Sequence, residues 1–427
     1  DDLQRSDHAP GGRVTDAPKP PNSPPGGPSP ARAFLSRNLV LVGLASLLTD
    51  MSSEMVYPIL PLFLTATLGA SPRVLGLIEG IVEAVASLTR VMSGWISDVM
   101  GKRKPFAVGG YALSVLGKLS LYLAASWPLV LGGRVLDRFG KGIRTAPRDA
   151  LLAESVPEDQ RGRAFGFHKA MDTLGAVLGV ICAYVLIRAG HSELRTVLVW
   201  SLAPAALAVV VLCFLRETGE GRHAASKRSR VRLTDAWHRA PKRLRLFYLI
   251  VFLFALGGSS NQFLLLRARG MGFSDANTIL LYLVYNLTYL ALSYPAGKLS
   301  DRIGRAPLLI TGYFIYAASY AGIAMIDHLP APTTLIWWIF ALYGTYIGLT
   351  DGVEKALVSD MSPSDARATF LGLHATITAL GLFPASLIAG WLYDTISPST
   401  AFWFGSGCSL IAGTLAVAFL RQPRGAA

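Results

Sequence analysis

The stretch GWISDVMGK (residues 94–102) recurs 203 residues later as GKLSDRIGR (residues 297–305). Both copies have glycine at the first and eighth positions, Ser-Asp at the fourth and fifth, and a basic residue at the end. The same offset relates Gly69 to Gly272. Such a repeat predicts that the chain consists of two homologous halves of about 200 residues each.

A second series of matches, with an offset of 206 residues, supports the same division. It pairs Gly142, Ala150, Leu151, Glu154, Pro157, Arg161, Gly166, His168, Leu174 and Gly175 with Gly348, Ala356, Leu357, Asp360, Pro363, Arg367, Gly372, His374, Leu380 and Gly381. So many matches in register are not explained by composition. Halves that share one orientation are a known plan of membrane transporters, in which the substrate binds between the halves near the middle of the membrane.

The composition of the chain is that of a membrane protein. Of its 427 residues, 52% are apolar and only 16% are charged, and its mean hydropathy is +0.43. A soluble domain has about 25% charged residues. The net charge of +13 could indicate nucleic-acid binding, but the basic residues lie in short loops between apolar runs, as the positive-inside rule requires. We therefore expect no nucleic-acid partner.

Cysteine usage and the first residues add little about function. Cys182, Cys213 and Cys408 all lie in apolar runs, so no disulfide framework is expected. Residues 1–33 are rich in proline and glycine and lack a signal-peptide pattern. They are predicted to form a disordered tail.

Twelve apolar runs are long enough to cross a bilayer, which takes about 20 residues. They lie near residues 38–66, 74–99, 105–125, 128–155, 163–189, 196–215, 246–268, 277–299, 307–327, 334–360, 368–392 and 400–420. An even number places both termini on one side, and the connections assigned to that side hold eighteen lysines and arginines against five on the other. This asymmetry predicts that both termini are cytoplasmic.

The expected fold is therefore an all-α membrane protein with twelve transmembrane helices in two six-helix bundles related by a pseudo-twofold axis. The predicted parts are a cytoplasmic tail (1–33), an N-terminal bundle (34–215), a basic cytoplasmic linker (216–245), a C-terminal bundle (246–421) and a cytoplasmic tail (422–427). We expect a monomer in the inner or plasma membrane.

In its spans, halves and repeated loop, the sequence resembles the major facilitator superfamily over residues 34–421. The most specific feature is the G-x-x-x-D-R-x-G-R/K pattern of the loop, in which Val99 stands where arginine is usual. In that family the loop helps to hold the cytoplasmic ends of the halves together in the outward-facing state, although a role as a topology anchor alone is the alternative. The resemblance implies a cytoplasmic gate formed by Gly94, Asp98, Gly101, Lys102, Arg103, Gly297, Asp301, Arg302, Gly304 and Arg305.

Two further patterns are similar to those of the twelve-span drug/proton antiporter branch of this family. The motif R-x-x-K-G-x-x-x-A (residues 138–146) resembles its fourth-span motif, with Lys141 in place of a common polar residue. The motif G-x8-G-x3-G (residues 166–179) resembles its fifth-span glycine motif, but Val180 and Ala183 replace the expected proline and glycine. Glycines at these spacings also let helices pack closely without any transport role.

The fourth predicted span contains RVLDRFGKGIRTAPRD (residues 134–149), which is unusually rich in charge. On a helix at about 100° per residue, its charged side chains fall within an arc of about 140°. They are Arg134, Asp137, Arg138, Lys141, Arg144, Arg148 and Asp149. Charges at membrane depth are costly unless they face a partner or a water-filled cavity. We therefore predict that this basic stripe forms one wall of a transport pathway.

Other ionisable residues of the N-terminal half are spaced one helical turn apart. They are Asp50 and Glu54 in the first span, Glu79 and Glu83 in the second, and His168 and Asp172 in the fifth. A nonpolar environment favours the protonated form of a carboxylate, whereas a nearby arginine favours the ionised form. We hypothesise that Asp50 and Glu54 respond to protons or cations, with Arg138 as their switching partner. A static charge network that only orders the bundle is the alternative.

The corresponding spans of the C-terminal half carry neutral polar and aromatic residues. We predict a substrate-cavity wall formed by Asn261, Gln262, Tyr282, Tyr285, Asn286 and Tyr289. An aromatic wall of this kind suits an organic amphiphile, although packing is the commoner reason for an aromatic helix face. Asp351, Glu354 and Lys355 are expected to form gate pairs.

The leading hypothesis is a secondary transporter that works by alternating access and exports a small organic compound or drug in exchange for protons. Its partners would be a small-molecule substrate, protons and the lipid bilayer, with the proton gradient as driving force and no cofactor.

One alternative is transport of an anionic metabolite on the basic stripe. Another is metal transport, because Met51 and Met55 lie beside Asp50 and Glu54, thioethers bind soft cations, and His168 would be a further ligand. No G-x-x-x-x-G-K-[ST] or HExxH motif occurs, so neither an ATP-driven pump nor an enzyme is expected.

Overall fold

The computed structural model of the chain describes residues 36–100, 103–156, 161–189, 193–216, 240–362 and 367–420. The predicted tails, most of the predicted linker, and Gly101 and Lys102 of the loop motif lie outside these ranges. Within them, the regular elements are all helical: α1 (Arg37–Val56), α2 (Leu60–Leu62), η1 (Phe63–Thr67), α3 (Pro72–Met100), α4 (Lys104–Leu123), α5 (Trp127–Glu154), α6 (Arg161–Arg188), α7 (Leu194–Cys213), α9 (Lys242–Gly257), α10 (Gln262–Gly270), α11 (Asp275–Ile303), α12 (Arg305–Met325), η4 (Ile326–His328), α13 (Pro332–Met361), α14 (Arg367–Thr395) and α15 (Pro398–Leu420).

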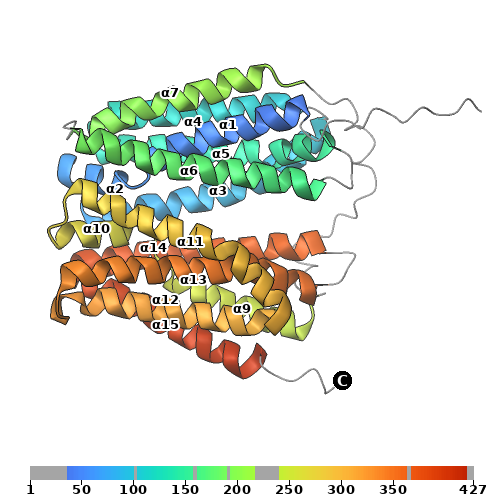
Figure 1. Cartoon of the computed structure of the whole chain (residues 1–427). Helices are drawn as coiled ribbons and strands as arrows, with labels where there is room; N and C mark the ends of the chain where they lie inside the picture. The colour runs from blue at the N-terminus through green and yellow to red at the C-terminus, as the bar shows by residue number, and fades with distance from the viewer. Residues whose placement is uncertain are drawn as a thin grey trace, which may run out of the picture.

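The helices lie in two groups that are stacked in Figure 1. The elements from α1 to α7 make the first helix group, and those from α9 to α15 make the second helix group. The groups meet where α3 packs against α14 and where α6 packs against α11. Helices far apart in the sequence therefore share the region between the groups.

Each of the twelve predicted runs coincides with one long helix, or with a helix in pieces for the first and seventh runs. Nine helical segments of the described ranges are long and apolar enough to cross a membrane. The other three runs correspond to α3, α5 and α13, which have 29, 28 and 30 residues. Charge explains the difference for α5, which carries the whole basic stripe. The chain is a multi-pass membrane protein, and the count of twelve spans stays a prediction.

Local sequence determines several helix ends. Ser36 and Ser274 cap α1 and α11, because their hydroxyl oxygens accept hydrogen bonds of 3.2 Å from the backbone N–H groups of Leu39 and Asn277. Proline occupies the first turn of α4, α5 and α13, where its missing N–H has no helical partner to lose. Gly304 has a φ of +93° between α11 and α12, which explains why the repeated loop requires glycine there.

Glycines let several helix pairs approach to backbone contact. A Cβ atom on Gly175 or Gly179 of α6 would collide with the carbonyl oxygen of Leu47 or Met51 of α1. On α14, a Cβ on Gly390 would lie 3.1 Å from the Cα of Gly76 on α3. The fifth-span glycine motif thus has a packing role at two of its three glycines.

Substituting these glycines tests that packing role. We expect Gly175→Ala to lower the free energy of unfolding by about 1–3 kcal/mol, because the added methyl group would force α6 away from α1. The measurement is thermal or denaturant unfolding of the purified protein in detergent. Gly166→Ala is the matched control, since a Cβ there meets no atom within 4 Å. Equal effects of the two substitutions would contradict the packing role.

Candidate functional site

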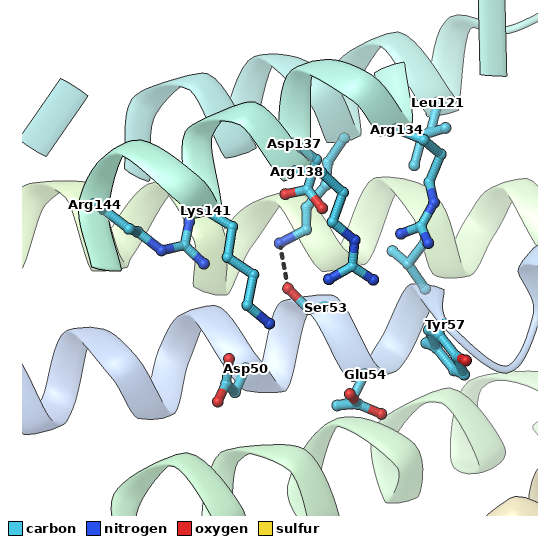
Figure 2. A pocket seen from close by; sticks show the side chains of 12 residues that line it. Asp50, Ser53, Glu54, Tyr57, Leu121, Arg134, Asp137, Arg138, Lys141 and Arg144 are labelled. Atoms are coloured by element: carbon cyan, nitrogen blue, oxygen red, sulfur yellow. Dashed lines mark hydrogen bonds between the residues drawn. The ribbon is translucent and has the colours of Figure 1, made fainter. Parts of the chain in front are cut away.

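A cavity of about 90 Å³ lies among α1, α4 and α5. Its lining consists of Asp50, Ser53, Glu54, Val56, Tyr57, Lys118, Leu121, Arg134, Asp137, Arg138, Lys141 and Arg144. Figure 2 shows basic side chains of the stripe extending from α5 towards α1. Seven of these twelve residues were predicted from the sequence: five of the seven stripe residues and the two carboxylates of the first span, which the fold brings into one site. Their roles in transport stay predictions.

Close packing of α5 against α4 directs the stripe into the cavity. A Cβ on Gly140 of α5 would lie 2.5 Å from the carbonyl oxygen of Gly110 on α4, and a Cβ on Gly117 would lie 2.6 Å from that of Gly133. These glycines of α4 and α5 let the two backbones touch without side chains between them. The long charged side chains of α5 leave from the neighbouring face, where Arg134 reaches α3 and Arg144 reaches Ser114 of α4.

Arg134 and Glu79 form a buried ion pair at one end of the cavity. An Nη atom of Arg134 lies 2.8 Å from Oε1 of Glu79, and the two side chains are only 4% and 9% exposed. The hydroxyl of Ser260 donates a second hydrogen bond of 3.0 Å to the other carboxylate oxygen. Glu79 of α3 thus binds α5 and, through Ser260, the second helix group.

Two other arginines of the stripe are also engaged by protein groups. Arg144 donates a hydrogen bond of 2.6 Å to the hydroxyl of Ser114, and its guanidinium lies 4.3 Å from the ring centre of Tyr111. Arg148 forms an ion pair of 2.9 Å with Asp149, and neither of those two residues lines the cavity.

Arg138 and Lys141 differ from the other basic residues of the stripe. In the described part of the chain, neither side chain makes a hydrogen bond or a short ion pair, and Nε of Arg138 is buried without an acceptor. Buried donors normally have partners. Both residues line the cavity, so their N–H groups can donate hydrogen bonds to a solute bound there.

Lys118 is a cavity residue that the sequence analysis missed. It lies on α4, is 2% exposed, and donates a hydrogen bond of 3.2 Å to the hydroxyl of Ser53 on α1. The available signal was a single lysine within an otherwise apolar predicted span, which is itself unusual at membrane depth. No regular spacing of charges marked it, because Lys118 joins the cluster only through the packing of α4.

Glu54 connects the cavity with the second helix group. The hydroxyl of Tyr282 on α11 donates a hydrogen bond of 2.9 Å to Oε2 of Glu54. The ring of Tyr282 also stacks on that of Tyr57, with 5.4 Å between the ring centres. Tyr57 lines the cavity beside Glu54, and Tyr282 packs behind its ring without lining the cavity itself.

The first helices of the two groups are interrupted at corresponding positions. The break after α1 covers residues 57–59, and the break between α9 and α10 covers residues 258–261. The repeat offset of 203 residues places Ser260 opposite Tyr57. Interrupted helices at equivalent positions of two repeats are a pointer to the binding site of a transporter, and both breaks border the residues described above.

Other predicted residues lie away from the cavity lining. Glu83 is half-buried on α3. His168 and Asp172 on α6 form their own pair, with 3.6 Å between Nδ1 and Oδ2. The other ring nitrogen of His168 lies 2.7 Å from the hydroxyl of Ser46. The pair on α6 forms a second cluster outside the cavity lining, and Arg148 of the stripe links to it by a hydrogen bond of 3.4 Å to the hydroxyl of Ser46.

The predicted wall of the second helix group is largely internally bonded. Asn261 donates to the hydroxyl of Tyr285 at 3.2 Å and accepts from Tyr343 at 2.7 Å. The side chain of Asn286 bonds the carbonyl of Tyr282 in its own helix at 2.9 Å. Two further wall residues behave differently: Gln262 is fully buried with no partner for its amide, and Tyr289 donates to Asp351 at 3.4 Å. None of the six lines the cavity.

The predicted gate residues of the second loop copy bond within the second helix group. Arg305 lies 3.1 Å from Asp301 and 2.6 Å from Asp360 at the end of α13. Gly297 and Arg302 lie near the end of α11, and Arg103 directly precedes α4. The side chains of Gly94 and Asp98 lie outside the described part.

The predicted gate pairs of α13 form two contacts. Lys355 lies 2.7 Å from Asp351, and His374 lies 3.5 Å from Glu354. The first pair is exposed and the second is buried.

The residues of the metal-transport alternative, Met51, Met55 and His168, are not gathered at the cavity. Met55 is part of the hydrophobic core, and Met51 does not line the cavity. His168 belongs to the separate cluster on α6. In the described ranges no group of three or more His, Cys, Asp or Glu side chains could hold a metal ion.

Comparison with known families and relatives gives consistent matches along most of the chain. The family model of the Major Facilitator Superfamily matches residues 42–381 and 247–427. An uncharacterised MFS-type transporter of Methanocaldococcus jannaschii is 39% identical over 387 residues, which cover 89% of this chain and 94% of that protein. The inner membrane transport protein YajR of Escherichia coli is 24% identical, with 86% and 80% covered. The multidrug resistance protein MdtH of Photorhabdus laumondii is 25% identical, with 82% and 85% covered.

Solved structures share the fold at lower sequence identity. The nucleoside transporter NupG has a TM-score of 0.75 at 14% identity, covering 90% of this chain and 100% of that chain. A D-xylose–proton symporter has a TM-score of 0.72 at 17% identity, covering 90% and 97%. At this level of identity the likeness shows the fold alone.

The buried pair of Arg134 and Glu79 gives a testable expectation. We expect Arg134→Leu or Glu79→Leu alone to cost about 3–5 kcal/mol of stability, because each leaves an unpaired buried charge. The double substitution should recover most of that loss. A double-mutant cycle from denaturant unfolding in detergent measures the coupling.

The exposed pair of Lys355 and Asp351 is the matched control for this cycle. Its side chains are 60% and 46% exposed, so breaking it should cost less than about 1 kcal/mol. Additive losses at Arg134 and Glu79 would show that the two charges do not depend on each other.

Proposed function

Because the chain belongs to the major facilitator superfamily, we propose that it is a secondary active transporter that exports a small organic compound in exchange for protons. Membership in the family supports secondary transport of small molecules across a membrane. The names of two relatives, a multidrug resistance protein and an inner membrane transport protein, favour export and an inner-membrane location.

The proposed architecture follows from the sequence repeat. Twelve spans would form two bundles, residues 34–215 and 246–421, with both termini in the cytoplasm and the protein acting as a monomer. The interruptions at residues 57–59 and 258–261 support a site between the bundles. Alternating access would then open this site to one side of the membrane at a time.

The observation that carries the proposal is that carboxylates of the first helix group accept hydrogen bonds from the second. Glu54 accepts from Tyr282, and Glu79 accepts from Ser260. A hydrogen bond to an ionised carboxylate is roughly twice as strong as one to a neutral group. Protonation of Glu54 would therefore weaken a contact between the groups, which is the link that proton-coupled alternating access requires.

Arg138 is the cation that we propose controls the proton affinity of Asp50 and Glu54. Its guanidinium lies in the same cavity as Asp50 and Glu54, without a hydrogen bond to either. A cation that is close to a carboxylate stabilises its ionised form. Movement of Arg138 towards or away from the carboxylates during the transport cycle would thus change how firmly they hold a proton.

Proton flux in proteoliposomes tests the proposal. With a pH gradient imposed and internal pH followed by a trapped dye, we expect Asp50→Asn, Glu54→Gln and Arg138→Ala to reduce substrate-driven proton flux by about tenfold or more, which corresponds to the loss of one charged interaction. A panel of organic compounds offered from the inside would supply the substrate.

Glu193→Gln is the control, because Glu193 is an exposed carboxylate at the start of α7 and lies outside the cavity lining. Its proton flux should equal that of the unmodified protein. If Asp50→Asn and Arg138→Ala retain full proton-coupled flux, the proposed coupling residues are wrong even though the fold is unchanged.

A narrower test concerns the contact between Glu54 and Tyr282. Tyr282→Phe removes only the hydroxyl, so it should leave folding intact and change the rate or stoichiometry of proton exchange. The comparison variant is Tyr294→Phe, because Tyr294 is 80% exposed on the same helix. Identical proton-flux traces for Tyr282→Phe and the unmodified protein would contradict a coupling role for this hydrogen bond.

A further inference from the structure

The basic residues of the stripe that line the cavity fall into two sets. Some are bonded to other side chains of the protein, and the others have N–H groups free to bind a solute. Arg134 is bound by Glu79, and Arg144 is bound by Ser114 and covered by Tyr111. Arg138 and Lys141 have no such partner in the described part of the chain, although both line the cavity. The sequence pattern singled out Arg138 as a switching partner, but it did not distinguish Lys141 from Arg134 and Arg144.

The available pair is well placed to hold one anionic group. Arg138 and Lys141 are three residues apart, so their side chains leave the same face of α5, and Figure 2 shows both directed towards α1. A guanidinium presents a planar fork of N–H donors that matches the two oxygens of a carboxylate or phosphate. The lysine ammonium adds a compact positive charge beside that fork.

Lys118 adds a third cation from a different helix. Its ammonium is buried on α4, donates a hydrogen bond to the hydroxyl of Ser53, and has Asp137 of the same lining as its main carboxylate neighbour. Lys118 therefore faces the cavity from the α4 side while Arg138 and Lys141 face it from α5. Three cations on two helices surround one small space.

The charge of the lining favours an anionic occupant. Five cationic side chains (Lys118, Arg134, Arg138, Lys141 and Arg144) face three carboxylates (Asp50, Glu54 and Asp137), so the lining has two surplus positive charges. Two further carboxylates lie outside the lining on α3: Glu79, the partner of Arg134, and Glu83, whose charge acts on Arg138. A cationic solute would add to this surplus, whereas an anion would neutralise it.

The size of the cavity argues for a small solute. Pockets that hold drug-sized ligands have volumes of about 300–1,000 Å³, compared with about 90 Å³ here. The ring of Tyr57 lines the cavity beside Glu54 and is backed by the ring of Tyr282, so it offers an apolar surface for the organic part of a small molecule. The cations and the ring of Tyr57 thus address two different parts of one solute.

We propose that the transported solute is a small organic anion, whose carboxylate or phosphate group binds Arg138 and Lys141 with Lys118 as the third cation. This assignment rests on the proposed transport function, and it specifies the substrate class of the same site. The other two stripe cations of the lining, Arg134 and Arg144, position the wall rather than bind the solute.

Ligand-dependent thermal stability of the purified full chain in lipid nanodiscs tests the assignment without any need for transport. The probes are succinate for carboxylates and inorganic phosphate for phosphates, with ribose and choline as neutral and cationic probes at matched ionic strength in sodium chloride. We expect succinate or phosphate to raise the melting temperature, and ribose and choline to leave it unchanged. The anion that stabilises more identifies the carboxylate or the phosphate class.

Substituted variants then identify which residues are responsible for the stabilisation by anions. Arg138→Gln and Lys141→Gln should weaken the anion response by on the order of tenfold or more, because each removes a charged hydrogen-bond donor. Arg138→Lys should keep a preference for anions with a weaker response, since it retains the charge but loses the fork. Lys242→Gln is the control, because this exposed lysine at the start of α9 lies outside the cavity lining.

Two results would overturn the assignment. One is stabilisation by ribose or choline that equals or exceeds that by the anions. The other is a rise in melting temperature with anion that is the same in Arg138→Lys, Lys141→Gln and the unmodified protein. These two variants test the assignment even if Arg138→Gln does not fold. Proton flux that fails while anion binding persists would instead remove the proposed proton coupling and leave the anion site in place.

Discussion

The ion pair between Arg134 and Glu79 is the contact on which the arrangement of the site depends. Charged groups buried away from water are costly unless each has a partner of opposite charge and further hydrogen bonds. Glu79 meets both conditions, because it binds Arg134 of α5 through one oxygen and Ser260 of the second helix group through the other. One carboxylate therefore fixes α5 relative to α3 and also links the two helix groups. With Arg134 held in this way, the next charged residues of the stripe face the cavity.

The all-helical membrane fold, and the residues of α5 that line the cavity, could be predicted from the sequence. Helices with apolar faces and capped ends give strong local signals, and a run such as residues 134–149 is conspicuous because charge is rare in apolar spans. The partners of those charges could not be predicted. Ser260 is 181 positions from Glu79, and Lys118 is 65 positions from Ser53. Periodicity indicates which face of a helix a residue occupies, but the residue opposite it depends on how distant helices pack.

The two helix groups contribute different chemistry to the region between them. The first supplies carboxylates and cations, some of them without protein partners, whereas the second supplies hydroxyl and amide groups that largely satisfy one another. Asn261, for example, bonds both Tyr285 and Tyr343. A polar network whose hydrogen bonds are nearly all formed is rigid. A network with unpaired N–H donors can still bind a ligand or change its partners. The two halves of the repeated sequence therefore differ in how far their polar side chains are already hydrogen-bonded within the protein.

The contact between Gly76 and Gly390 has a consequence for how the conformations of this protein could be trapped. The backbones of α3 and α14 touch there with no side chain between them, so the present arrangement leaves no space for even a methyl group. An alanine at either position would act as a wedge, penalising this state and favouring any state in which the two helices part. The methyl group of one alanine could thus shift the populations of the conformers, without any change of charge and without contact with the cavity.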